Sequence, residues 1–123
     1  MLRQLRINTQ RVLSRRRQST VPPTITNKYL LTYKYVDNIV ELREPFREEH
    51  FRNGLHELKA GRLQEAGAFA DPVDGAMFVF TNCDSEGPVK KFVEKDPYYV
   101  EGLVLDYKIR KWTVAINSDE KSD

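Results

Sequence analysis

The sequence predicts an α+β fold, a four-stranded antiparallel sheet with two helices on one face. Two segments carry apolar residues at helical spacing, and each lies between segments rich in strand-forming residues. The middle strands are joined by Asp71-Pro72-Val73-Asp74-Gly75, whose residue types favour a turn and therefore a hairpin. The resulting order, β-α-β-β-α-β, is that of the ferredoxin-like fold.

The first strand is expected at residues 29–35, which are rich in strand-forming side chains. One face of this strand would be made of Tyr29, Leu31, Tyr33 and Tyr35. Asp37 and Asn38 end the strand, and residues 39–44 are expected to form a loop or an irregular turn.

The first helix is expected to begin near Pro45 and to close at Gly61 with a left-handed cap. Its apolar residues at helical spacing are Phe51, Leu55 and Leu58. These three side chains are therefore the expected buried face. On a helical wheel His50 falls at the border of that face, one turn after Arg47, whereas His56 falls on the solvent side.

The second half of the chain supplies the hairpin, a second helix and a last strand. The hairpin strands are expected at residues 63–70 and 76–81. Ser85 is a candidate N-cap for the second helix, which Asp96-Pro97 would end. The expected buried face of that helix contains Val89, Phe92 and Val93. The last strand would follow Gly102 and run from Leu103 to about Val114.

Both faces of the expected sheet carry apolar residues, but two helices can cover only one face. In the third strand, one face would carry Ala76, Phe78 and Phe80, and the other would carry Met77 and Val79. In the last strand the two faces are Leu103, Leu105, Tyr107 and Ile109 against Val104, Trp112 and Val114. An exposed apolar surface of this size usually marks an interface. We therefore expect a homodimer that pairs through the open sheet face.

The first twenty residues differ from the rest, because they contain six arginines and no acidic residue or lysine. Wound as a helix, they present a basic face and an apolar face, which is typical of a mitochondrial transit peptide. The alternative is a disordered basic tail that binds nucleic acid or acidic lipid. We expect a leader at 1–20, a linker at 21–27, a folded domain at 28–116 and a polar tail at 117–123, with the mature protein in the mitochondrial matrix.

Composition restricts the partners of the folded part. The chain has 20 basic and 18 acidic residues, so without the leader 14 basic and 18 acidic residues remain, a net charge of −4. An acidic domain gains no general attraction to nucleic acid. No apolar run approaches the ~20 residues that span a bilayer. With two histidines and one cysteine, neither an internal disulfide, a metal site nor a bound cofactor is expected.

His50 is the residue best placed for chemistry, because an imidazole can accept and donate protons near neutral pH. The alternative is a boundary histidine that only packs or caps. Asp96 also has two interpretations: it caps the break before Pro97, or it points into a cleft and orients His50. Sequence spacing leaves both open.

One set of motifs is more specific. It consists of Arg47-x-x-His50-Phe51, Gly61-Arg62-Leu63-x-x-Ala66-Gly67, and Asp96-Pro97-Tyr98 followed by Gly102 and a strand. With these motifs, residues 28–114 resemble the YCII-related (YciI-like) family. The chain departs from the family at Ala68, where a proline usually follows the Ala-Gly pair, and this bears on the path of the second strand.

The resemblance implies a dimeric α/β barrel and a His–Asp pair in a cleft, which maps to His50 and Asp96. It also implies lyase- or hydrolase-like chemistry on a small aromatic or enolisable molecule, since one relative is a dehydrochlorinase. Arg47, Gly67 and Tyr98 are then the candidate substrate-binding residues. The alternatives are a non-catalytic dimer that binds a metabolite, or an RNA-binding module with an aromatic third strand.

Overall fold

The computed structural model describes residues 26–118 of the chain. The expected leader, the polar tail beyond Ser118 and all of the expected linker except Thr26 and Asn27 lie outside the described residues. Residues Thr26–Val114 form one compact unit. The described residues that follow it, 115–118, belong to a second unit and contain no helix or strand.

The predicted four-stranded antiparallel sheet is confirmed. Its strands are β1 (Thr26–Tyr35), β2 (Leu63–Ala68), β3 (Gly75–Phe80) and β4 (Val104–Val114), in the spatial order β2-β3-β1-β4. All three pairings are antiparallel. β1 begins earlier than expected, inside the predicted linker, because Thr26 pairs with Val114 at the end of β4.

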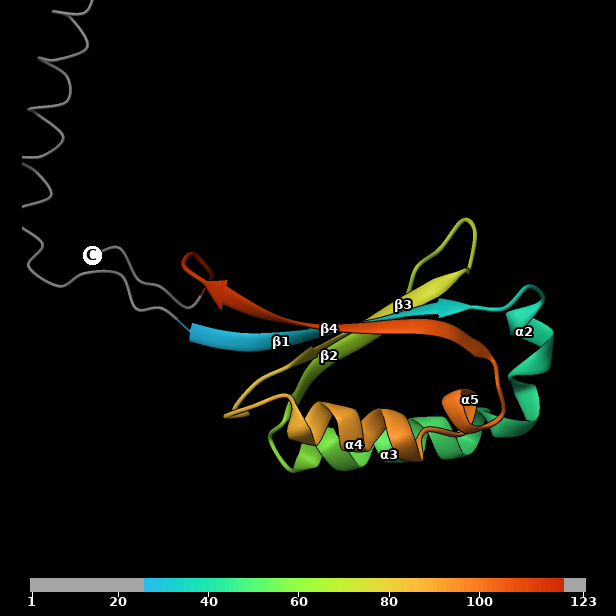
Figure 1. Ribbon diagram of the computed structural model, residues 1–123, viewed down its shortest axis with the longest axis horizontal. Coiled ribbons are helices and arrows are strands. Elements are labelled where there is room, and N and C mark those ends of the chain that lie inside the picture. Colours follow the sequence, from blue (N-terminus) through green and yellow to red (C-terminus); the bar gives the residue numbers. More distant parts are fainter. Residues whose placement is uncertain (1–25, 119–123) are drawn as a thin grey trace, which may run out of the picture. The chain divides into compact units, whose positions relative to one another are not determined.

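The helices are α2 (Ile39–Leu42), the 3-10 turn η1 (Glu44–Phe46), α3 (Arg47–Lys59), α4 (Gly87–Lys95) and α5 (Pro97–Val100). Figure 1 shows α3, α4 and α5 on one side of the sheet. The two predicted helices are α3 and α4, and α5 adds one turn directly after α4. Residues 39–44, expected to form a loop or an irregular turn, contain the short helix α2, which buries Ile39, and the start of η1.

The core lies between the helical layer and the inner face of the sheet. The predicted inner face of β1 is confirmed, since all four of its side chains are buried. The predicted buried face of α4 is confirmed as well: Val89, Phe92 and Val93 are all buried. Aromatic rings fill much of the space between them, as in the edge-to-face contact of Tyr33 with Phe78 at 4.9 Å.

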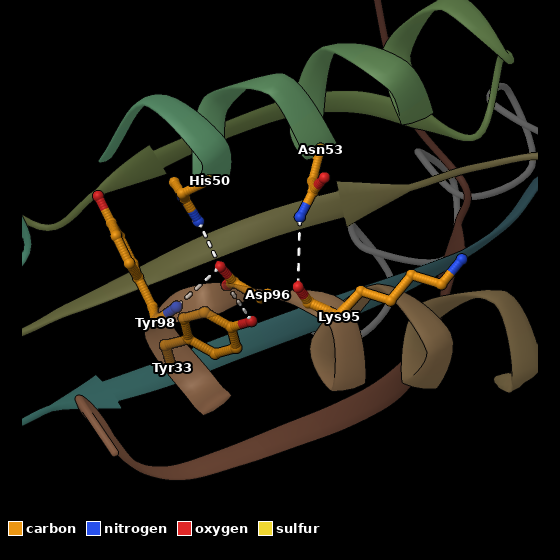
Figure 2. Close-up of polar contacts among 6 residues, drawn as sticks. All are labelled: Tyr33, His50, Asn53, Lys95, Asp96 and Tyr98. Carbon is orange, nitrogen blue, oxygen red and sulfur yellow. Dashed lines mark hydrogen bonds and ion pairs between the residues drawn. The ribbon is translucent and has the colours of Figure 1, made fainter. Parts of the chain in front are cut away.

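The predicted orientation of the first helix was wrong. Its apolar residues are about half exposed, at 51% for Phe51, 55% for Leu55 and 45% for Leu58. The side of α3 turned towards the protein instead contains His50, at 8% exposure, and the partly buried Asn53. The Asn53 side-chain amide donates a hydrogen bond to the Lys95 carbonyl oxygen at 3.3 Å, which ties α3 to the end of α4 (Figure 2).

The outer face of the sheet is less apolar than expected. By register, Tyr107 and Ile109 pair with Tyr33 and Leu31 and therefore share the inner face. The outer face carries the partly buried Leu30, Met77 and Val79, the 46% exposed Trp112, and the basic side chains Lys108 and Arg110. No helix among residues 26–118 covers this face (Figure 1).

Candidate functional site

A groove of about 700 Å³ runs between α3 and the edge strand β2. The apolar stripe of α3 forms one wall, and residues Leu63–Ala68 form the other. Ala76 and Phe78 of β3 lie between these walls. The exposed Phe51, Leu55 and Leu58 therefore border a binding groove rather than a core.

His50 borders this groove and points one ring nitrogen away from it. Its Nδ1 lies 2.8 Å from Oδ1 of Asp96, a hydrogen-bonding distance (Figure 2). Asp96 is fully buried. The helix break at Pro97 holds Asp96 in an extended conformation between α4 and α5, and so aims its side chain at α3.

Two further donors fix the Asp96 carboxylate. The Tyr33 hydroxyl donates to Oδ2 at 2.7 Å, and the Tyr98 backbone N–H donates to Oδ1 at 3.1 Å. Both interpretations of Asp96 from the sequence therefore hold in the structure. The residue caps the helix that begins at Pro97 and contacts His50 with the same oxygen.

Three hydrogen-bonding groups converge on Asp96: the Tyr33 hydroxyl, the Tyr98 N–H and Nδ1 of His50. Nε2 of His50 has no hydrogen-bond partner in the part of the chain that the structure describes. A tautomer with the proton on Nδ1 would donate to Asp96 and leave Nε2 as a proton acceptor beside the groove that His50 borders.

Tyr98 fixes the plane of the imidazole. Its ring stacks on that of His50 with the centroids 3.9 Å apart and the planes 7° from parallel. Tyr98 is 2% exposed, yet it borders the groove beside His50. Stacking on one side and the Asp96 bond at one edge leave the histidine a single orientation.

Arg47 and Gly67, the candidate substrate-binding residues that the resemblance implied, both border the groove. The Arg47 side chain is 44% exposed, lies 3.7 Å from Glu44 and sits over the Phe51 ring at 5.0 Å. Gly67 lies in β2, and nothing stands within 4 Å of the position where a Cβ would be. All five predicted site residues therefore line the groove or, for Asp96, hold a residue that does.

No sequence pattern points to Tyr33 or Arg43 as site residues. The alternation of Tyr33 with Leu31 is that of a core strand and gives no sign that the Tyr33 hydroxyl meets Asp96. Burial, and then the charge and hydrogen bond of Asp96, raise the pKa of the Tyr33 phenol far above its usual range, so that it remains a donor. Arg43 lay in the segment expected to be a loop.

A second hollow of about 360 Å³ lies along the other side of α3, between the exposed His56 and Lys91 of α4. Its best-defined contact is the Arg62–Glu57 ion pair at 2.7 Å, in which these two charges are paired with each other. Among residues 26–118, no hydrogen bond to the His56 side chain is found that would orient it towards this hollow. The groove at His50 is therefore the candidate site.

The described residues were also searched for metal sites and for membrane-spanning helices. No group of three or more histidine, cysteine, aspartate or glutamate side chains among residues 26–118 is arranged to hold a metal ion. Within the same residues, no helix is both long enough and apolar enough to span a bilayer.

Comparison with known proteins identifies the family of the chain. The family model of the YCII-related domain matches residues 27–113, and the chain therefore belongs to the YCII-related family. No curated protein matches the chain.

Among solved structures, the 5-chloro-2-hydroxyhydroquinone dehydrochlorinase of Burkholderia phenoliruptrix, in complex with 2,5-dihydroxybenzoquinone, is similar with a TM-score of 0.58. The two sequences are 22% identical, and the match covers 69% of this chain and 92% of that chain. At this level of identity the likeness shows a shared fold.

The structure makes the Tyr33 hydroxyl a specific support of Asp96. We expect Tyr33→Phe to lower the free energy of unfolding by about 1–3 kcal/mol, because one carboxylate oxygen loses its donor in a fully buried place. Tyr29→Phe is the matched control on the same face of β1, since no hydrogen bond to its hydroxyl is found among residues 26–118. Urea unfolding of both variants measures the difference, and equal losses would contradict this role.

Proposed function

We propose that the protein is an enzyme that moves a proton on a small ring compound, with His50 as the general acid or base. The observation that supports this most is the 2.8 Å contact of His50 Nδ1 with the buried Asp96 beside an apolar groove. A histidine held in one tautomer by a carboxylate is a recurring arrangement for proton transfer.

The proposed step is lyase-like. His50 Nε2 takes a proton from a carbon of the bound ring, and the electron pair of that C–H bond enters the ring as an enolate or expels a leaving group. His50 then returns the proton to the product or to water. Asp96 keeps its own charge throughout and stabilises the imidazolium that forms between the two transfers.

The other groove residues would bind the ring. Arg47 supplies positive charge at the mouth of the groove, and Tyr98 packs behind His50. Gly67 borders the groove with its backbone, which would lie against a flat ligand. The similar dehydrochlorinase was solved with a hydroxyquinone, which agrees with a flat ligand of this kind.

The test replaces His50 by asparagine. The asparagine amide can take the place of Nδ1 and still donate to Asp96, but it has nothing in the place of Nε2. Alanine would be less suitable, because it removes a partner of a buried carboxylate and so lowers stability. We expect His50→Asn to slow proton exchange by about 10²–10⁴-fold while the fold is retained.

Hydrogen–deuterium exchange of a panel of enolisable ring compounds in D₂O, followed by proton NMR, measures this effect. His56→Asn, at the exposed histidine of the same helix, is the control and should exchange as the wild type does. Binding of panel members without any accelerated exchange would contradict catalysis and support a metabolite-binding dimer.

We also propose that two copies associate through the outer sheet face to form a dimeric α/β barrel. The supporting observation is the cluster of half-buried Leu30, Met77 and Val79 beside the exposed Trp112 on a face that no described helix covers. Burial of these side chains against a second copy would remove apolar surface from water.

For this surface we expect Val79→Glu to convert a dimer into a monomer, because it places a charge within the apolar cluster. Val100→Glu on α5, at a valine that is 61% exposed, is the matched control and should leave the dimer intact. Light scattering of the eluting protein gives the mass. A wild-type monomer at micromolar concentration would contradict the proposal.

For residues 1–20 we propose import into the mitochondrial matrix. The support is compositional: six arginines, apolar residues between them and no acid. A fluorescent protein fused after residues 1–25 should enter mitochondria, and replacement of the six arginines by glutamine should leave it in the cytosol. Cytosolic fluorescence of the unmodified fusion would contradict import.

A further inference from the structure

The guanidinium of Arg43 borders the groove without a partner. Its Nε is buried and has no hydrogen-bond acceptor among the described residues. No ion pair of Arg43 is found within the same part of the chain. A buried charged donor without an acceptor is unfavourable, and proteins normally supply a partner for such a group. Because Nε itself is buried, a ligand in the groove that Arg43 borders would be bound by the terminal nitrogens of the same guanidinium.

The backbone holds Arg43 in a fixed place. Its N–H donates to the Ile39 carbonyl at 2.9 Å, and its carbonyl accepts from the Phe46 N–H at 2.9 Å. Ile39 is 2% exposed, so α2 is anchored in the core. Arg43 therefore projects from a rigid junction between α2 and η1, which is a condition for a preorganised binding group.

Two phenols lie close to this guanidinium. Burial raises the pKa of both Tyr35 and Tyr98, and the positive charge of Arg43 opposes that increase in each. No hydrogen bond to either hydroxyl is found within residues 26–118. The lining of the groove therefore combines the guanidinium of Arg43 with two phenols, both of which burial keeps protonated at neutral pH.

Arg47 is a weaker candidate than Arg43 for binding a negatively charged group of a ligand. Its charge is shared with Glu44 at 3.7 Å and with the ring of Phe51. Glu65 is the one acidic residue that borders the groove, and it belongs to the opposite wall in β2. Among the described residues that border the groove, Arg43 is therefore the arginine whose charge no ion pair holds.

We propose that Arg43, with the hydroxyls of Tyr35 and Tyr98, binds a planar oxyanion of the ligand, a carboxylate or an acidic hydroxyquinone, on an apolar ring. The flat fork of a guanidinium matches two coplanar oxygens. Tyr98 connects the two parts of the site, because its ring stacks on His50 and its phenol is near Arg43. This assignment of ligand class rests on the proposed function for the reaction at His50.

The test compares 1-naphthoate with its neutral isostere 1-naphthamide, and adds 2,5-dihydroxybenzoquinone as the second anion. We expect the wild type to bind naphthoate at least about tenfold more tightly than naphthamide, and Arg43→Gln to abolish that preference. Arg43→Gln should change naphthamide binding by less than about twofold, because naphthamide carries no negative charge for Arg43 to bind. Isothermal titration at neutral pH gives all the constants.

Three further variants show whether the preference for naphthoate depends on the charge, the shape or the position of the Arg43 side chain. Arg43→Lys keeps the charge without the fork and should recover part of the preference. Arg47→Gln should weaken naphthoate binding less than Arg43→Gln does. Arg52→Gln, at an exposed arginine of α3 that does not border the groove, should leave it unchanged. Near-ultraviolet circular dichroism shows that each variant is folded.

The proposal is overturned if the wild type binds acid and amide equally, if Arg43→Gln leaves naphthoate binding unchanged, or if neither anion binds at millimolar concentration. A hydroxyquinone bound in preference to naphthoate would identify which oxyanion the site takes. An intact acid preference without any proton exchange would reject the reaction and keep the anion site. Proton exchange without a preference for the acid would reject the anion site and keep the reaction at His50.

Discussion

The structure depends on one buried carboxyl group, that of Asp96. Removing an ionised carboxylate from water costs several kcal/mol unless donors replace the lost hydration. The donors here come from three elements: Tyr33 of β1, His50 of α3 and the Tyr98 N–H of α5. Sheet, long helix and the short helix after the Asp-Pro break are therefore held to one another at a single point (Figure 2).

This constraint explains the orientation of α3. His50 must face inward to reach Asp96, so its side of the helix is turned to the protein, and the apolar stripe one step around the helix borders the groove. One requirement thus creates both halves of the site, the oriented imidazole and the apolar wall beside it. Arg43 completes it with positive charge, which would also stabilise the negative charge that develops on a ring when His50 removes a proton.

Sequence patterns predicted the strand order, the hairpin, both main helices and the buried face of α4, because each depends on local periodicity and turn chemistry. They could not predict the rotation of α3, since Phe51, Leu55 and Leu58 at helical spacing look alike whether they face a core or a groove. His50 and Asp96 were candidates from the residues alone, but their pairing was implied only by the family resemblance, because the contact spans 46 positions. Tyr33 and Arg43 carried no local signal, because a strand tyrosine looks like core and a loop arginine looks like surface.

The central claim is that Asp96 holds His50 with its proton on Nδ1 and presents Nε2 to the groove. Nitrogen-15 NMR of the histidine ring at neutral pH, with His56→Asn used to assign the signals, reports the tautomer directly. The account predicts a protonated Nδ1, with a strongly deshielded proton that is lost in Asp96→Ala, and an unprotonated Nε2. A His50 ring that carries its proton on Nε2, or whose signals are unchanged in Asp96→Ala, would contradict it.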